Sequence, residues 1–212
     1  MKQKTHIFDV DQVLAPDSWI LLANEHLESK GEKTVEEHEI NSPFYFSKQI
    51  FNTPEKMTSF LDFYLSQEIY ANLSPIEGSV DCLQELSETD KVILSSKVLP
   101  LFKGINPAYN HRFAITEFDQ KLRWLAKHFP FIPAHSSFNI TASKDMLHGY
   151  SIVDDNLEFL TDNFNNNSDN FKKRLLFSRP HNLNISQAQL DAVGSIRVND
   201  FKEIKDQLME VK

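Results

Sequence analysis

Short runs of apolar residues alternate along the chain with longer segments in which apolar positions recur at helical spacing. The runs lie within residues 4–14, 91–94, 138–141, 151–153, 175–177 and 195–198. Continuous apolar runs of this length are typical of strands buried on both faces of a parallel sheet. The helical stripes lie within residues 19–27, 57–65, 79–88, 118–128, 157–164 and 200–209. The alternation predicts an α/β fold: a Rossmann-like parallel sheet covered by helices on both faces.

The segment 18–75 follows the first predicted strand, and its residues 32–75 lack strand patterning. The segment holds the first two helical stripes with an aromatic run between them, and residues 73–78 form a Pro- and Gly-containing turn back to the sheet. We therefore predict one domain, with a core of residues 1–17 and 76–212. Residues 18–75 are expected to be a small helical cap inserted after the first strand.

Three polar segments mark the ends of predicted elements. Asp17 or Ser18 is expected to cap the helix that begins the insertion, and Asn199-Asp200 is expected to cap the last helix. The Asn- and Asp-rich residues 163–170 are typical of a mobile loop.

Composition narrows the class of protein. The 212 residues are 41% hydrophobic and include 17 Phe, which is enough to fill a core. A formal net charge of -8 argues against a nucleic-acid or anionic-membrane binder, because nothing offsets repulsion of phosphate groups. The single cysteine, Cys82, excludes an internal disulfide.

The chain enters a strand at once and has no 18-residue apolar run, so we expect a cytoplasmic protein with no membrane segment. The sequence leaves open whether the protein forms a homodimer.

Polar side chains follow the predicted strands where their carboxyl ends would meet. They are Asp9 and Asp11, Ser95 and Ser96, Lys144, and Asp154 with Asp155. Each alone has an ordinary interpretation: an acidic turn, a helix cap or a solvated lysine. Ligands bind at the carboxyl ends of strands in open parallel sheets. The set therefore predicts a metal-assisted phosphate site, with carboxylates for Mg²⁺, hydroxyls for phosphoryl oxygens and an ammonium for negative charge. Asp9 and Asp11, two positions apart on one strand, are expected to reach the same cation.

These residues also resemble, in chain order, the four motifs of the haloacid-dehalogenase-like phosphohydrolases. Further segments make the sequence similar to the 5′(3′)-deoxyribonucleotidases of that superfamily. The matching segments are Asp9-Val10-Asp11-Gln12-Val13-Leu14-Ala15, Phe44-Tyr45-Phe46-Ser47-Lys48-Gln49, residues 73–80, Ser95-Ser96-Lys97-Val98, and Lys144 spaced ten and eleven residues before Asp154 and Asp155. The resemblance covers residues 5–160. It implies a haloacid-dehalogenase-like core with a helical cap and Mg²⁺ as cofactor. The substrate that it implies is a nucleoside 5′-monophosphate, with deoxyribonucleotides favoured.

Two positions depart from the family pattern. Gln12 replaces the usual glycine, so the turn after Asp11 is expected to adopt a conformation that a side chain tolerates. Ser95 replaces the usual threonine and keeps the hydroxyl.

The resemblance assigns a role to each polar residue. Asp9 would be the nucleophile that forms an aspartyl-phosphate, and Asp11 the acid and base. Mg²⁺ would lie between the Asp9 carboxylate, the Asp11 main-chain carbonyl and Asp155, with Asp154 beside it. Ser95, Ser96 and Lys144 would hold the phosphoryl oxygens and balance their charge.

The aromatic run Phe44-Tyr45-Phe46 has two readings. It could simply pack the interior of the cap. With the resemblance, we expect a platform on which a nucleobase stacks, with Trp19 and Val98 completing the wall.

Other protein classes could also carry these polar residues, but two of them do not fit the sequence. A response-regulator receiver needs its lysine after the last acids, and a nucleotide-binding glycine loop needs clustered glycines, whereas the five here are scattered. Two alternatives stay open: a phosphatase of the same superfamily acting on another small phosphate ester, and a non-catalytic binding relative.

Overall fold

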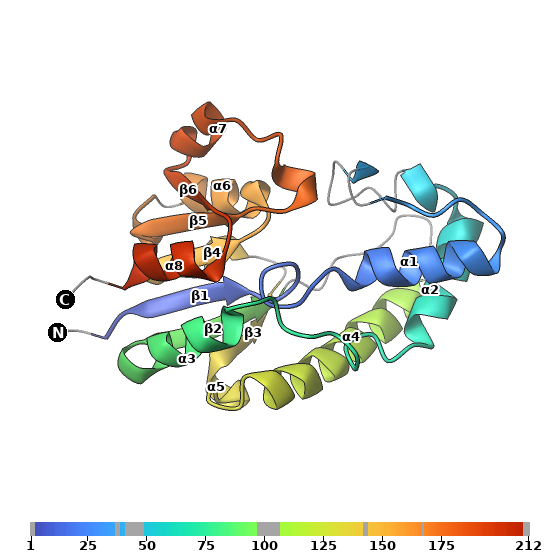
Figure 1. Ribbon diagram of the computed structural model, residues 1–212, viewed down its shortest axis with the longest axis horizontal. Helices are drawn as coiled ribbons and strands as arrows, with labels where there is room; N and C mark the ends of the chain where they lie inside the picture. Colours follow the sequence, from blue (N-terminus) through green and yellow to red (C-terminus); the bar gives the residue numbers. More distant parts are fainter. Residues whose placement is uncertain are drawn as a thin grey trace.

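The computed structural model describes residues 3–36, 39–40, 49–96, 107–141, 144–166 and 168–209. Their centre is a six-stranded sheet in the order β3-β2-β1-β4-β5-β6, in which every pairing is parallel. The prediction of a parallel α/β sheet is confirmed (Figure 1). The strands are β1 (Thr5–Asp9), β2 (Lys91–Ser96), β3 (Phe138–Ile140), β4 (Ser151–Asp154), β5 (Lys173–Phe177) and β6 (Ser195–Val198).

Helices connect these strands and cover the sheet. They are α1 (Ser18–Ser29), α2 (Pro54–Leu65), α3 (Ser79–Thr89), α4 (Pro107–His128), α5 (Ala134–Ser137), α6 (Leu157–Asn166), α7 (Gln187–Ala192) and α8 (Phe201–Leu208). Three short 3-10 helices are η3 (Lys144–Met146), η4 (Ser168–Asn170) and η5 (Pro180–Asn182). The predicted caps are confirmed: Asp17 accepts hydrogen bonds from the first amides of α1, and Asp200 accepts one from Glu203.

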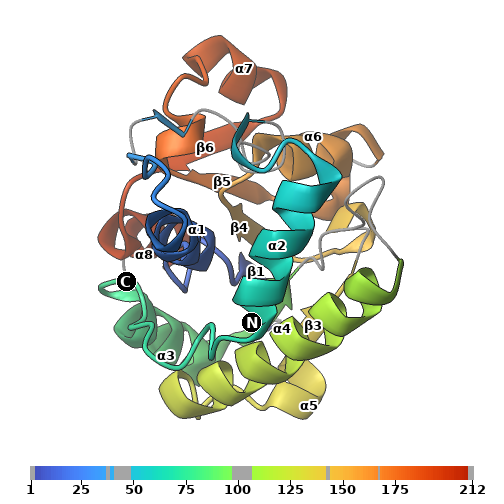
Figure 2. The same cartoon turned by 90° about the vertical axis from the view of Figure 1, so that its right-hand side faces the viewer.

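Alternate residues of the strands enter two separate apolar layers. Ile7 and Ile152 pack with Leu160 of α6, whereas Phe8 and Val153 belong to the larger core that includes α3 and α8. Figure 2 shows α3 and α8 on one side of the sheet and α6 on the other. Both faces are therefore covered, which explains why the strands read as continuous apolar runs rather than alternating ones.

Helices α1, α2 and the first half of α4 lie beyond the carboxyl ends of the strands (Figure 1). Their contact is aromatic: the ring of Tyr64 stacks on Trp19 at 4.8 Å and on Phe113 at 5.7 Å between centroids. α1 and α2 come from the predicted cap, but Phe113 belongs to the range predicted as core. The boundaries of the cap stay a prediction.

Several predicted elements differ from the structure. β1 ends at Asp9 rather than Leu14, because the amides of Leu14 and Ala15 turn back to the Val10 carbonyl. α4 begins at residue 107 rather than 118, and its first half packs on α2, where the ring of Phe113 stacks on that of Tyr64. The predicted mobile loop is wrong for its described residues: α6 runs to Asn166, and buried Asn163 donates to the Leu147 carbonyl.

Within the described residues, no helix has the length and apolar character needed to cross a membrane. The cytoplasmic location stays a prediction.

Candidate active site

The parallel register brings the predicted polar residues to one edge of the sheet. Asp9 is the last residue of β1 and lies opposite Ser95 of β2, while Asp154 ends β4 on the other side of β1. Lys144 begins η3, shortly after β3. These four residues are buried, with exposed fractions between 1% and 6%. Charged groups tolerate such burial only when they are paired, so their contacts are informative.

Lys144 joins two of the aspartates. Its Nζ donates to Asp9 Oδ1 at 2.5 Å and to Asp154 Oδ2 at 2.8 Å. Burial alone would lower the pKa of Lys144, but Asp154 and Asp9 raise it above its ordinary value, so this lysine is charged. Burial raises the pKa of Asp9 and the neighbouring carboxylates add to this effect, while Lys144 opposes it; the net pKa lies well above the ordinary value. The site therefore holds more buried negative charge than one lysine neutralises.

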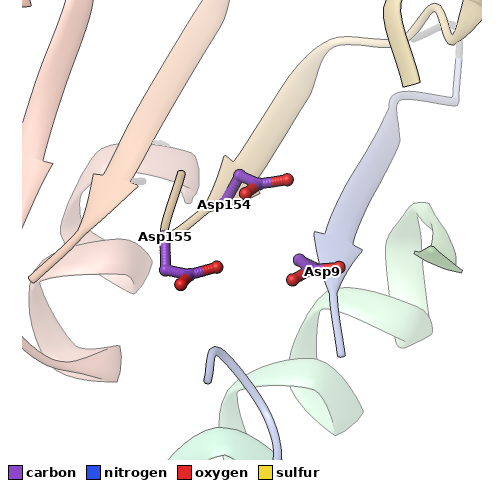
Figure 3. A group of neighbouring side chains, drawn as sticks. All are labelled: Asp9, Asp154 and Asp155. Atoms are coloured by element: carbon purple, nitrogen blue, oxygen red, sulfur yellow. The ribbon is translucent and has the colours of Figure 1, made fainter. Parts of the chain in front are cut away.

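Asp9, Asp154 and Asp155 could hold a metal ion. One carboxylate oxygen from each lies within 4.8 Å of the others, and Figure 3 shows the three side chains facing a common point. The donor set is oxygen only, which suits a hard divalent cation such as Mg²⁺ better than zinc. The excess of buried negative charge fits the same group, because a cation would offset it.

The Asp11 carboxylate hydrogen-bonds to three side chains outside the group of Asp9, Asp154 and Asp155. Its Oδ1 accepts from the Tyr70 hydroxyl at 2.7 Å, and its Oδ2 accepts from Lys121 Nζ at 2.6 Å and from Ser96 Oγ at 3.1 Å. β1 ends at Asp9, so strand alternation does not extend to Asp11, and the sharing of one cation by the two carboxylates stays a prediction. Asp11 as a ligand through its main-chain carbonyl stays a prediction. Burial would raise the pKa of Asp11, but Lys121 and the hydrogen bonds together lower it, so the carboxylate is charged.

Lys121 was missed by the sequence reasoning. It lies on α4 with only 2% of its surface exposed, and it also donates to Ser96 Oγ at 2.9 Å and lies 3.5 Å from Glu117 Oε2. Glu117 in turn accepts from the Tyr64 hydroxyl at 2.9 Å. A signal was present, because Lys121 is three and four positions before the apolar pair Trp124 and Leu125 and so shares their buried face.

Ser95 provides a hydroxyl at the centre of the site. Its Oγ is buried, and no group among the residues that the structure describes hydrogen-bonds to it. A buried hydroxyl without a partner is costly, and a ligand oxygen would satisfy it.

Gln12 lies in the turn that follows Asp11. Its φ is 60°, in the left-handed region, and its amide donates to the Ala15 carbonyl at 2.8 Å. A side chain tolerates this left-handed conformation, but only at a cost in free energy. The turn keeps a geometry that glycine adopts without the cost of about 1–2 kcal/mol that other residues bear.

Trp19, predicted as a wall of the substrate site, is half-buried in the aromatic contact between α1, α2 and α4. Phe44, Tyr45, Phe46 and Val98, the other predicted substrate contacts, lie outside the described residues.

The chain was compared with protein families and with known proteins. Residues 4–212 match the sequence profile of the family described as 5′-nucleotidase, deoxy (pyrimidine), cytosolic type C protein. The chain belongs to this family. It is therefore a phosphoric monoester hydrolase of the 5′-nucleotidase type, as the sequence resemblance implied. The match continues through residues 161–212, beyond the segments that carried the resemblance.

Individual relatives agree with this assignment. The 5′(3′)-deoxyribonucleotidases of Bacillus subtilis (strain 168) and of Bacillus phage SPbeta are each 27% identical over 210 residues, which cover 98% of this chain and 99% of the relative.

Among solved structures, a haloacid-dehalogenase-like hydrolase of Streptococcus pneumoniae is 14% identical with a TM-score of 0.52, covering 98% of this chain and 99% of its own. A Bacillus subtilis protein assigned to the same hydrolases, bound to magnesium, is 10% identical with a TM-score of 0.58, covering 99% of this chain and 100% of its own. The fold is therefore haloacid-dehalogenase-like.

Proposed function

We propose that the protein hydrolyses nucleoside 5′-monophosphates, deoxyribonucleotides among them, with Mg²⁺ and through a phosphorylated Asp9. The observation that carries the proposal is the buried cluster of Asp9, Lys144 and Asp154 beside the unpartnered Ser95 hydroxyl. A phosphate monoester supplies what this cluster lacks: oxygens for the hydroxyl and a phosphorus atom for the carboxylate. The named substrate class comes from the two deoxyribonucleotidase relatives.

Asp9, Asp154 and Asp155 are the residues that would hold Mg²⁺. When bound, the ion would supply positive charge that screens the anionic phosphate from the carboxylates. The remaining chemistry belongs to the side chains.

Asp9 would attack phosphorus, so that an O–P bond forms as the bond to the nucleoside oxygen breaks. Ser95 and Ser96 would donate to the phosphoryl oxygens, and Lys144 would stay between Asp9 and Asp154 to hold the attacking carboxylate in place. A proton from Asp11 would go to the leaving oxygen.

Water then cleaves the aspartyl-phosphate, and Asp11 takes up the proton. The ionised Asp11 of this structure suits this second step. For the first step Asp11 must be protonated, which would follow if the phosphoryl group drew Lys121 and Ser96 away from the Asp11 carboxylate. Phe44 and Tyr45 are proposed to stack on the base, with Phe46, Val98 and Trp19 around it, and residues 18–75 are proposed as the cap that carries most of these side chains.

A panel of monophosphates tests the proposal. Deoxyribonucleoside and ribonucleoside 5′-monophosphates, sugar phosphates and an aryl phosphate should be assayed with Mg²⁺ and again with excess chelator. The expected result is preferred turnover of nucleotides that stops with chelator and returns with added Mg²⁺. Preference for sugar phosphates would support the alternative phosphatase, and no turnover at all would support a binding relative. Full activity with chelator would contradict the metal assignment.

A further inference from the structure

The two acids after β4 present a geometric problem. Consecutive residues of an extended strand point to opposite sides, yet the carboxylates of Asp154 and Asp155 both face the candidate metal site that they form with Asp9 (Figure 3). Asp155 must therefore be held in a bend rather than in strand geometry. Asn156 fixes Asp154 by donating its amide to Oδ1 at 2.9 Å, but it makes no such bond to the Asp155 side chain in the described contacts.

The loop after β5 supplies the contacts to Asp155. His181 Nε2 lies 3.1 Å from Asp155 Oδ2 and 3.2 Å from the Asp155 carbonyl oxygen. Both of these oxygens are acceptors, so His181 must carry its proton on Nε2 and donate it. One imidazole thus contacts both the side chain and the main chain of Asp155, which fixes the rotation of the carboxylate.

Asn182 anchors this loop to the sheet. Its Nδ2 donates to the Asp155 carbonyl at 2.8 Å and to the Phe177 carbonyl at 2.9 Å. Arg197 of β6 donates to Asn182 Oδ1 at 3.1 Å and to the Asn182 carbonyl at 3.2 Å. Asn182 therefore connects the ends of β4, β5 and β6 by hydrogen bonds. His181, the residue before it, is buried, with 7% of its surface exposed.

We infer that His181 is a positioning residue that holds the Asp155 carboxylate for Mg²⁺. With Oδ2 held by the imidazole, we expect Oδ1 of Asp155 to be the oxygen that binds the ion. Partners of this kind orient metal ligands, and their loss typically weakens metal affinity by about 10- to 100-fold. The inference rests on the proposed function for the identity of the ion.

The test uses two substitutions at this position. His181→Leu keeps much of the volume but removes the donor, whereas His181→Gln places an amide N–H near the position of Nε2. The matched control is His135→Leu, because His135 is an exposed histidine on α5. Each protein is titrated with Mg²⁺ by calorimetry without substrate, and its melting temperature is measured in chelator and in Mg²⁺.

We expect His181→Leu to raise the Kd for Mg²⁺ by about 10- to 100-fold and to shrink the melting-temperature gain from Mg²⁺. His181→Gln should restore most of both, and His135→Leu should behave as wild type. The Mg²⁺ concentration for half-maximal activity should rise in parallel, while kcat at saturating Mg²⁺ changes far less.

Different results would identify which idea fails. If wild type neither binds Mg²⁺ nor hydrolyses nucleotides, the proposed function is wrong. If wild type does both and His181→Leu binds Mg²⁺ as tightly, the positioning role alone is overturned. Equal weakening by Leu and Gln, with lower melting temperatures in chelator, would also overturn it, because the ring would then only fill space in the loop.

Discussion

Replacing Lys144 by methionine should destabilise the protein strongly, because one ammonium serves two buried carboxylates. The side chains of Lys144, Asp9 and Asp154 are 2%, 8% and 1% exposed. Methionine keeps most of the apolar stem and lacks only the terminal ammonium, so the main change is the loss of charge and of two short hydrogen bonds. Removing one partner of a buried ion pair typically costs about 3–5 kcal/mol of unfolding free energy. For a chain of this size, that corresponds to a fall of about 6–20 °C in Tm.

The loss should depend on pH in a defined direction. Without Lys144 the pKa values of Asp9 and Asp154 rise further above those of the unfolded chain, since burial and mutual repulsion already raise them. Such acids stabilise the fold when protonated, and this contribution is lost as pH rises through the folded-state pKa. The deficit of the variant relative to wild type should therefore be large near about pH 8 and shrink toward about pH 5.

Urea unfolding in chelator at both pH values measures this effect. The control is Lys205→Met, the same chemical change at a half-exposed pair with Glu85, where little loss is expected. A Lys144→Met protein as stable as the control, or a deficit that grows toward acid pH, would refute the account of the buried cluster.

Three further predictions concern other parts of the molecule. Burial lowers the pKa of His6, against the opposing effect of Asp90, so stability should fall as pH drops below about 6.5; His6→Gln should flatten the urea midpoint across that window, and an unchanged slope would contradict the assignment. Gln12→Val should lose stability, because a β-branched residue is tolerated less well than glutamine in the left-handed region, whereas Gln12→Gly, which removes the strain, should not; equal urea midpoints for the two variants would count against the strain. Phe44→Ala with Tyr45→Ala should lower kcat/KM for a nucleotide by about 5- to 150-fold and that for an aryl phosphate much less; parallel losses with a lowered Tm would indicate cap packing instead.

The positions of the acids could be predicted because topology alone determines them. In a parallel sheet, whatever follows each strand reaches the same edge, so Asp9, Ser95 and Asp154 meet there once the strands are recognised. Lys144 follows by the same rule, since it lies just beyond β3. The sequence resemblance then supplied the roles that position alone does not.

The residues that surround these acids could not be found in this way. Lys121 reaches Asp11 from a helix whose start was not recognised, because its first half packs on α2 and leaves Ile115 70% exposed. His181 comes from a loop without any periodic pattern. Its position depends on Asn182 and Arg197, which are brought together only by pairing of β5 with β6.

The turn at Gln12 shows how tertiary bonds override local preference. The amide of Gln12 donates to Ala15, and those of Leu14 and Ala15 donate to Val10. Closing this turn requires one left-handed residue, and the hydrogen bonds gained outweigh the modest strain of a side chain there.

The central claim is that Asp9 is the nucleophile, and Asp9→Asn tests it most directly. The amide is nearly isosteric and cannot attack phosphorus. With Mg²⁺ and a deoxyribonucleoside 5′-monophosphate, we expect wild type to turn over and the folded variant to show no measurable kcat. A folded Asp9→Asn protein that kept more than about a tenth of the wild-type kcat, a barrier change under about 1.4 kcal/mol, would contradict the claim.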